Sequence, residues 1–504
     1  MDINRAKQEI KNTVRAYLAK NEDGTYRIPS VQQRPVLLMG PPGIGKTAIM
    51  EQAANECGIA LVSYTITHHT RQSAIGLPFI SKRSYGGREY TITEYTMSEI
   101  IASVYDKMEE TGLKEGILFI DEINCVSETL APTMLQFLQR KSFGSHFVPE
   151  GWIIAAAGNP PEYNKSVRDF DIVTLDRLKR IDVTENLDVW KPYAYRRQIH
   201  PAILSYLDVK KQNFYIVETT VDGKAFVTAR GWEDLSSLLQ TYEELAIPVA
   251  EDVVREYLQH PTIARDFAVY YDLFCKYQSD YHVDNILEGN MPQSSLERLK
   301  NAPFDERVSV IGLLIGKLTN RFAELYFTEL TIRTLYDSLR YCKTMLGREP
   351  ITELLEREAD NIRTSLATRK KASAVEPKEA RALEKAASTL IAFRKQVSAS
   401  GKPEDEFVVL SEQFSALTEE LEQNTERASQ ALEAAFAFLA TAFGKSQEMV
   451  VFVTELNTDF YSTEFIAENG SEAYSRYNKD LMIGRQRREL LGDIDKVKVF
   501  LQGL

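Results

Sequence analysis

Cysteines and long apolar runs are scarce in this sequence. Its 504 residues include four cysteines, scattered without a C-x-x-C pair: Cys57, Cys125, Cys275 and Cys342. This pattern predicts reduced, buried thiols rather than disulfides. No apolar run approaches the length of about 18 residues that a membrane span needs, and the N-terminal MDINRAKQEIKN has no signal-peptide core. We therefore expect a cytoplasmic protein that does not insert into membranes.

The sequence also lacks an excess of basic over acidic residues. The chain has 60 Lys and Arg against 72 Asp and Glu, a net charge of −12. This balance argues against binding nucleic acid or an anionic membrane over much of the surface, although a local basic pore could still exist within it. The hydrophobic share of 44% and the charged share of 26% are those of a globular protein. The length predicts about two to four domains.

The stretch VLLMGPPGIGKT, from Val36 to Thr47, contains the pattern G-x-x-x-x-G-K-T. The four apolar residues before the loop predict a buried parallel strand, and AIMEQAA after it predicts a helix. Glycines let the loop turn tightly and direct its N–H groups inward, and the helix adds its positive N-terminal end. Lys46 would then reach the β- and γ-phosphates, and the Thr47 hydroxyl would bind magnesium. The predicted nucleotide cradle consists of Gly40, Pro41, Pro42, Gly43, Ile44, Gly45, Lys46, Thr47 and Ala48.

A second apolar strand, GILFIDE, ends in the carboxylates of Asp121 and Glu122. Parallel strands present such residues at their carboxyl edge. Asp121 is placed to hold magnesium, directly or through water, and Glu122 to orient and deprotonate the attacking water. An acidic pair after a strand is often only a solvated turn, but downstream of a phosphate loop it favours catalysis.

A third buried strand, Ile153 to Ala157, is followed by Gly-Asn-Pro. Asn159 would therefore lie at the same sheet edge as Asp121. Its amide can donate to the γ-phosphate and accept from water, which suits a sensor that positions the nucleophile. Turn formation before proline is the alternative. The segment VTLDRLKRIDV follows, with Arg177 at the mouth of the last strand.

These strands alternate with helices, which predicts a doubly wound parallel sheet in an α/β domain over residues 1–188. Within it we expect an amphipathic helix over 1–19, a strand over 59–66, a turn at Ser84-Tyr-Gly-Gly, and helices over 98–110 and 127–139. We also expect a hairpin over 143–152 that turns at Gly144-Ser145.

Beyond the α/β domain the sequence predicts mainly helices. We expect a helical lid over 189–260, with a hairpin over 213–227 and a helix opening at Thr228-Ala-Arg230. A helical domain over 261–346 follows, with apolar residues at helical spacing from Phe304. Residues 347–504 predict extended helical hairpins, because their phenylalanines need burial (Phe393, Phe407, Phe414, Phe436, Phe443, Phe452 and Phe460).

The segments GPPGIGKT, ILFIDEI, AAAGNPPEYN and LDRLKR together resemble AAA+ ATPases. More narrowly, VPEGW before AAAGNP and the VTAR helix start are similar to the hairpin and lid of the MoxR family. The irregular stretch after the second strand lies where that family carries a helix-2 insert. The likeness covers roughly residues 30–260, and the last 240 residues or so depart from the short MoxR proteins.

This resemblance implies ATP and Mg²⁺ as cofactors, and it gives Lys46, Thr47, Asp121, Glu122 and Asn159 the Walker A, Walker B and first-sensor roles. Arg177 would be the arginine finger that enters the neighbouring subunit's site, with Arg180 as the alternative finger. Arg230 would be the second sensor on the lid, with a solvated helix-start residue as its alternative. The family also implies a ring, usually a hexamer, and a partner protein with a von Willebrand A domain.

The leading hypothesis is thus an AAA+ ATP hydrolase with a chaperone-like action on a protein partner. A DNA- or RNA-dependent motor is one rival, supported weakly by Arg140, Lys141 and His146 beside the expected hairpin, although nucleic acid is an unfavoured partner for so acidic a chain. A nucleotide-switched scaffold is the other rival. The presence of Glu122, Asn159 and both candidate fingers counts against it.

Overall fold

The computed structural model describes residues 1–66, 74, 76–163, 170–220, 223–345, 348–371, 375–400 and 403–479. The chain divides into two compact units, one of Met1–Val189 with Thr364–Glu376, the other of Trp190–Arg363 with the chain from Pro377. The finer division into four domains stays a prediction.

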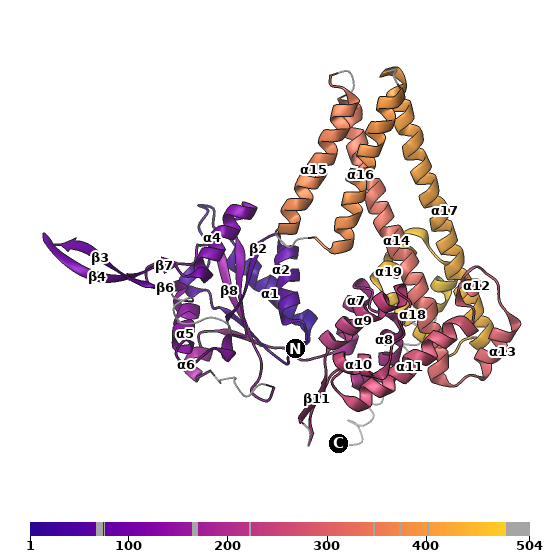
Figure 1. The fold of residues 1–504 in the computed structure, drawn as a ribbon, viewed down its shortest axis with the longest axis horizontal. Coiled ribbons are helices and arrows are strands. Elements are labelled where there is room, and N and C mark those ends of the chain that lie inside the picture. Colours follow the sequence, from indigo (N-terminus) through magenta and orange to yellow (C-terminus); the bar gives the residue numbers. More distant parts are fainter. Residues whose placement is uncertain are drawn as a thin grey trace, which may run out of the picture. The chain divides into compact units, whose positions relative to one another are not determined.

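Within the described residues, the first unit contains strands and the shorter helices of the N-terminal part of the chain (Figure 1). They are α1 (Ile3–Tyr17), η1 (Ser30–Gln32), β1 (Val36–Met39), α2 (Lys46–Cys57), β2 (Ala60–Thr65), β3 (Pro78–Tyr85), β4 (Arg88–Tyr95), α4 (Glu99–Thr111), β5 (Gly116–Asp121), η3 (Ile123–Cys125), α5 (Ala131–Arg140), β6 (Ser142–Phe143), β7 (His146–Phe147), β8 (Trp152–Gly158), α6 (Ile172–Leu175) and β9 (Lys179–Asp182).

Five of these strands form one parallel sheet in the order β2-β5-β8-β1-β9. β1 and β8 are buried along their whole length, as expected for strands covered on both faces. Helices α4 and α5 bury Ile101 and Phe137 in the same apolar core as Leu118 of β5 and Ile154 of β8. The predicted α/β fold is confirmed. Because the strands are parallel, all their carboxyl ends lie at one edge of the sheet.

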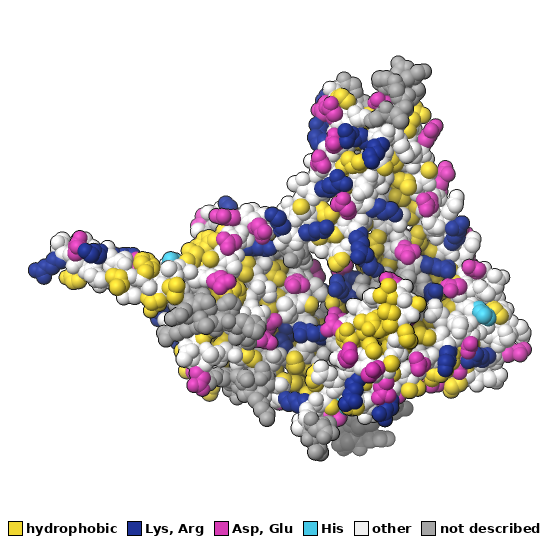
Figure 2. Space-filling view, in the orientation of Figure 1, with side chains coloured by type: hydrophobic (Ala, Val, Ile, Leu, Met, Phe, Trp, Pro, Cys, Tyr) yellow, Lys and Arg dark blue, Asp and Glu magenta, His cyan; other side chains and the backbone are white. Residues whose placement is uncertain are grey.

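A long hairpin of β3 and β4 projects from this sheet domain (Figure 1). Its turn is Gly86-Gly87, and both residues have positive φ, as a tight two-residue hairpin turn requires. The predicted turn here is therefore confirmed. Apolar side chains are exposed along the hairpin (Figure 2), among them Leu77, Phe79, Ile80, Tyr85, Tyr90 and Tyr95.

Two predicted boundaries in this unit were wrong. Helix α5 begins at Ala131 instead of residue 127, because Pro132 occupies its first turn, where a missing N–H is tolerated. The second hairpin, β6–β7, turns at Gly144-Ser145 as predicted but ends at Phe147. Pro149 has no N–H to continue the ladder, and Trp152 already begins β8.

The second unit is mainly helical, as predicted, and its described residues include a short hairpin. Apart from the first residues of α7 and the last turns of α15, its elements are α7 (Leu187–Arg196), α8 (Pro201–Val209), η4 (Lys211–Phe214), β10 (Ile216–Thr220), β11 (Gly223–Val227), α9 (Ala229–Glu244), α10 (Glu251–Tyr257), α11 (Pro261–Asp280), α12 (Val283–Leu287), α13 (Gln293–Asn301), α14 (Phe304–Thr344), α15 (Ile351–Lys371), α16 (Pro377–Ser400), α17 (Pro403–Phe443), α18 (Gln447–Thr458) and α19 (Phe460–Asn469).

The long helices α14, α16 and α17 pack along one another, and the first part of α15 joins them (Figure 1). Their shared core includes Leu335, Leu354, Leu390 and Phe393. The phenylalanines that motivated the hairpin prediction do find burial. Phe393, Phe436 and Phe452 are buried, and Phe407, Phe414, Phe443 and Phe460 are half-buried.

The four cysteines are free thiols, in agreement with the prediction. Their predicted burial is wrong in part: Cys342 is buried, Cys57 and Cys125 are half-buried, and Cys275 is exposed. None of the helices that the structure describes combines the length and the low polarity needed to cross a membrane.

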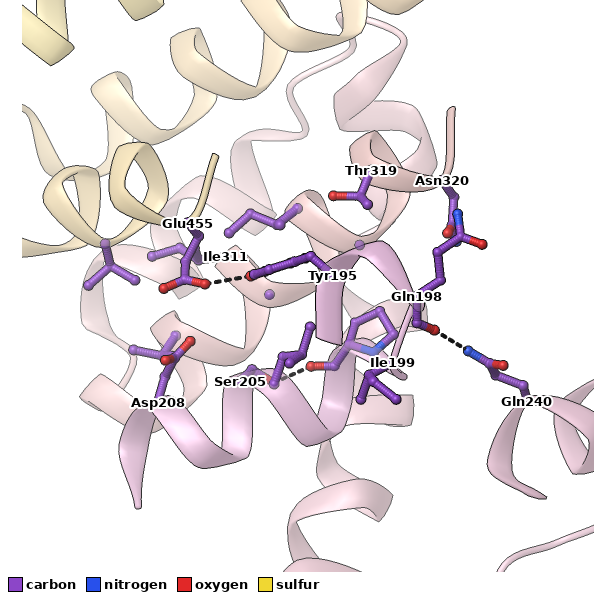
Figure 3. Close-up of a pocket in the computed structure, with 17 residues that line it drawn as sticks. Tyr195, Gln198, Ile199, Ser205, Asp208, Gln240, Ile311, Thr319, Asn320 and Glu455 are labelled. Carbon is purple, nitrogen blue, oxygen red and sulfur yellow. Dashed lines mark hydrogen bonds between the residues drawn. The ribbon is translucent and has the colours of Figure 1, made fainter. Parts of the chain in front are cut away.

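A buried ionic cluster connects α18 with α7 and α8 within the second unit, and Figure 3 shows three of its members, Tyr195, Asp208 and Glu455. The Lys191 ammonium contacts Asp208 Oδ1 at 2.5 Å and Glu455 Oε1 at 2.6 Å, and the Tyr195 hydroxyl donates to Glu455 Oε2 at 2.5 Å. One cation thus faces two carboxylates. Burial and the nearby Glu455 charge raise the pKa of Asp208 to about 6. Helix α18 of the C-terminal extension therefore forms buried polar contacts with residues 189–260, the region that the sequence predicts to be the lid.

Candidate nucleotide site

The phosphate loop joins the end of β1 to the start of α2. Gly43 and Gly45 have φ of 73° and 89°, a conformation that glycine adopts without steric cost. Gly45 is the N-cap of α2 and forms no side-chain cap. The first-turn N–H groups of α2 are therefore not satisfied by a capping side chain, and together with the helix dipole they favour an anion.

Lys46 links this loop to the end of β8. Its side chain is buried, and Nζ donates to Gly40 O at 2.9 Å, Pro41 O at 2.8 Å and Asn159 Oδ1 at 2.8 Å. The lysine is thus held where the loop folds over the sheet edge, beside the residue predicted to be the first sensor.

Thr47 and Asp121 meet across the same edge. The Thr47 hydroxyl donates to Asp121 Oδ2 at 2.8 Å. A hydroxyl and a carboxylate this close suit Mg²⁺, which prefers oxygen ligands and is commonly held by one or two carboxylates together with substrate phosphates. Among the described residues, no three His, Cys, Asp or Glu side chains gather into a metal-binding cluster. The Thr47 hydroxyl and the Asp121 carboxylate fit a magnesium that arrives with a nucleotide.

Glu122 follows Asp121 in a strained backbone conformation. Its φ is 55°, which costs about 1–2 kcal/mol for a residue other than glycine. Its N–H donates to Asp121 Oδ1 at 2.9 Å, so the same turn that ends β5 also orients the aspartate. Strain of this kind often occurs at functional sites.

Asn124 is the site residue that the sequence reasoning missed. Its side chain is buried, and Nδ2 donates to Asn159 O at 2.8 Å while Oδ1 accepts from Asn159 N at 3.3 Å. Gly158 makes room for it, because a Cβ there would lie 2.6 Å from Asn124 Oδ1. The available signal was an amide two residues after Glu122, between Ile123 and Cys125.

The two candidate fingers lie away from these residues. Arg177 precedes β9, at the amino end of the strands, and its exposed guanidinium donates to Gln139. Arg180 lies on β9 and pairs with Asp182 on the same strand at 2.8 Å. The structure thus brings Lys46, Thr47, Asp121, Glu122 and Asn159 together at the carboxyl edge, and places both arginines elsewhere.

Arg230 belongs to the second unit. It is an exposed residue in the first turn of α9, whose N-cap Thr228 accepts a hydrogen bond from Gly231 N. Its role as a second sensor stays a prediction.

Residues 36–175 match the family described as "ATPase family associated with various cellular activities (AAA)". This segment begins with β1 and contains the loop, Asp121, Glu122 and Asn159. The chain therefore carries an ATPase domain. More narrowly, this domain is of the AAA type. No curated protein matches the chain.

Proposed function

We propose that this protein is an oligomeric, magnesium-dependent AAA+ ATPase that uses ATP hydrolysis to remodel a protein partner. The observation that carries the proposal is the pair of contacts at one sheet edge, Thr47 with Asp121 and Lys46 with Asn159. These contacts connect the residues that follow the phosphate loop to the carboxyl ends of β5 and β8.

Each residue at this edge has a chemical task in the proposal. The loop N–H groups and Lys46 bind the phosphates, and Thr47 and Asp121 hold Mg²⁺, which would neutralise phosphate charge. Glu122 accepts the proton of the attacking water, while the Asn159 amide orients that water toward the γ-phosphate. Asn124 keeps Asn159 in place through its backbone.

The proposal includes a homo-oligomeric ring, hexameric as in the family that the sequence resembles. Arg177 is the favoured finger because it is exposed and its contact is to the neutral amide of Gln139, whereas Arg180 is neutralised by Asp182. A finger in trans stabilises the charge of the transition state in the neighbouring site.

A protein is the favoured partner. The β3–β4 hairpin exposes Phe79, Ile80 and Tyr85, side chains suited to a protein surface. The MoxR resemblance further suggests a partner with a von Willebrand A domain. The nucleic-acid motor loses part of its support, because Lys141 is buried, donates to Gln33 Oε1 at 2.8 Å, and has a pKa that burial lowers to about 8.

Two variants test the ATPase proposal. Lys46→Ala should abolish ATP binding measured by calorimetry, because it removes the only side-chain cation of the loop. Glu122→Gln should bind ATP and hydrolyse it at least about a hundredfold more slowly, the usual scale for a general base. Glu109→Gln, on the exposed face of α4, is the matched control and should turn over normally. If Lys46→Ala binds ATP with undiminished affinity, or if Glu122→Gln hydrolyses ATP at the normal rate, the role proposed for that residue is contradicted.

A further inference from the structure

Helices α14, α17 and α19 of the second unit line an open groove of about 530 Å³, here called the acidic groove. Its floor is aromatic. Phe322 and Phe465 stack with ring centroids 4.2 Å apart, and Tyr461 is buried beside them. Tyr326 lines the same groove with 39% of its surface exposed. Phe322, Phe465 and Tyr461 are themselves buried, so the apolar surface open to a ligand comes from Tyr326 and from the half-buried Leu325 and Leu421.

Five glutamates surround this floor: Glu329, Glu422, Glu426, Glu464 and Glu468. Among the described residues that line the groove, none is a lysine or an arginine. Within the described part of the chain, Glu426 accepts from Gln430 at 2.8 Å, while the other four form no hydrogen bond or ion pair. Burial and the charge of Glu468 raise the pKa of Glu329, against a smaller opposing effect of Arg333, so these two carboxylates repel each other.

A second groove, of about 670 Å³, lies on another face of the α14–α17 pair, and its charges differ. It carries Glu288 and Glu324 together with Arg321 and Arg427, so its lining is balanced. The five unbalanced charges of the acidic groove therefore do not follow simply from the composition of these helices.

We propose that the acidic groove binds a basic amphipathic segment of a partner protein, one in which Lys or Arg side chains alternate with apolar ones. The apolar side chains would cover the open surface of Leu325 and Leu421, and the cations would meet the glutamates and the exposed face of Tyr326. Charge complementarity selects this occupant over an acidic or a purely apolar one. The inference does not depend on ATP hydrolysis.

Fluorescence anisotropy on the full chain tests this proposal, with a labelled Lys/Leu amphipathic peptide as the probe. We expect saturable binding that weakens with added salt, because screening reduces charge attraction. The double variant Glu422→Lys/Glu468→Lys should weaken binding about tenfold or more, which corresponds to about 1.4 kcal/mol. The matched control, Glu288→Lys/Glu324→Lys in the balanced groove, should bind as the parent does.

Two further probes separate the alternatives. A Lys/Ser peptide of equal charge should bind more weakly, since it cannot cover the open apolar surface of the groove, and spermidine should compete poorly. Circular dichroism and ATP turnover of each variant report whether it is folded, and Glu422→Gln/Glu468→Gln provides a milder change if the lysine variant unfolds. Absent binding of the Lys/Leu peptide, equal losses in both double variants, or equal affinity for spermidine overturns the proposal.

Discussion

Removing the Asn124 side chain should uncouple the candidate sensor from its support. Asn124→Ala deletes the donor to Asn159 O and the acceptor for Asn159 N, at 2.8 Å and 3.3 Å. A hydrogen bond contributes about 1 kcal/mol net, and an unpaired buried partner costs about 1–3 kcal/mol. The free energy of unfolding of the variant should therefore fall by about 2–4 kcal/mol.

The same change should slow hydrolysis more than it weakens binding. Lys46 and Thr47 are untouched, so affinity for ATP should stay close to the parent value. Asn159 would lose its fixed position, and a misplacement of about 1 Å can reduce rate by about a hundredfold. We expect kcat to fall about 10- to 100-fold with little change in KM.

Steady-state kinetics measure the change in kcat of Asn124→Ala, and urea denaturation measures the change in its free energy of unfolding. Asn12→Ala, an exposed asparagine on α1, is the control and should change neither. A kcat equal to that of the parent, with the stability loss present, would show that Asn124 only supports the fold and has no positioning role.

Two other predictions concern the arginines and the ionic cluster. Arg177→Ala should keep nucleotide binding and stop turnover in the assembled ring, whereas Arg180→Ala should remain active; the reverse result in an ATPase assay identifies Arg180 as the finger. Lys191→Met leaves Asp208 and Glu455 buried without their cation, so its free energy of unfolding should fall by about 3–5 kcal/mol at pH 8. The pKa of Asp208 is about 6 in the folded protein and 3.8 in the unfolded chain. Ionised Asp208 therefore destabilises the folded state above pH 6. This destabilisation decreases as the pH falls from about 6 to 3.8, because Asp208 becomes protonated in the folded protein. The loss in Lys191→Met should therefore be smaller at pH 5, and equal losses in urea denaturation at pH 5 and pH 8 would contradict this assignment.

Local patterns were sufficient to predict the sheet and the meeting of its loops. The apolar run before Gly40 and the one before Asp121 each have the length and burial of a parallel strand. Since parallel strands end at one edge, the sequence could place Lys46, Asp121 and Asn159 near one another without a structure. Their functional roles stay predictions.

Features that depend on contacts between distant segments could not be predicted in this way. Asn124 and Asn159 are 35 residues apart, and only the pairing of β5 with β8 makes their hydrogen bonds possible. Lys191 and Glu455 are separated by 264 residues, so no local sequence pattern predicts that they form an ion pair. The acidic groove likewise combines glutamates from three helices whose packing no local pattern determines.

The strand register gives a physical reason why the proposed catalytic site would need a second subunit. Lys179 lies opposite Val36 and Asp182 opposite Met39, so β9 runs parallel to β1 from the amino edge toward the phosphate loop. Arg177 precedes the start of β9, whereas the loop follows the end of β1. With about 3.3 Å per residue, four residues of strand span roughly 13 Å, which is longer than an arginine side chain. If Arg177 is the finger, it therefore cannot complete the site of its own chain, and hydrolysis would depend on assembly.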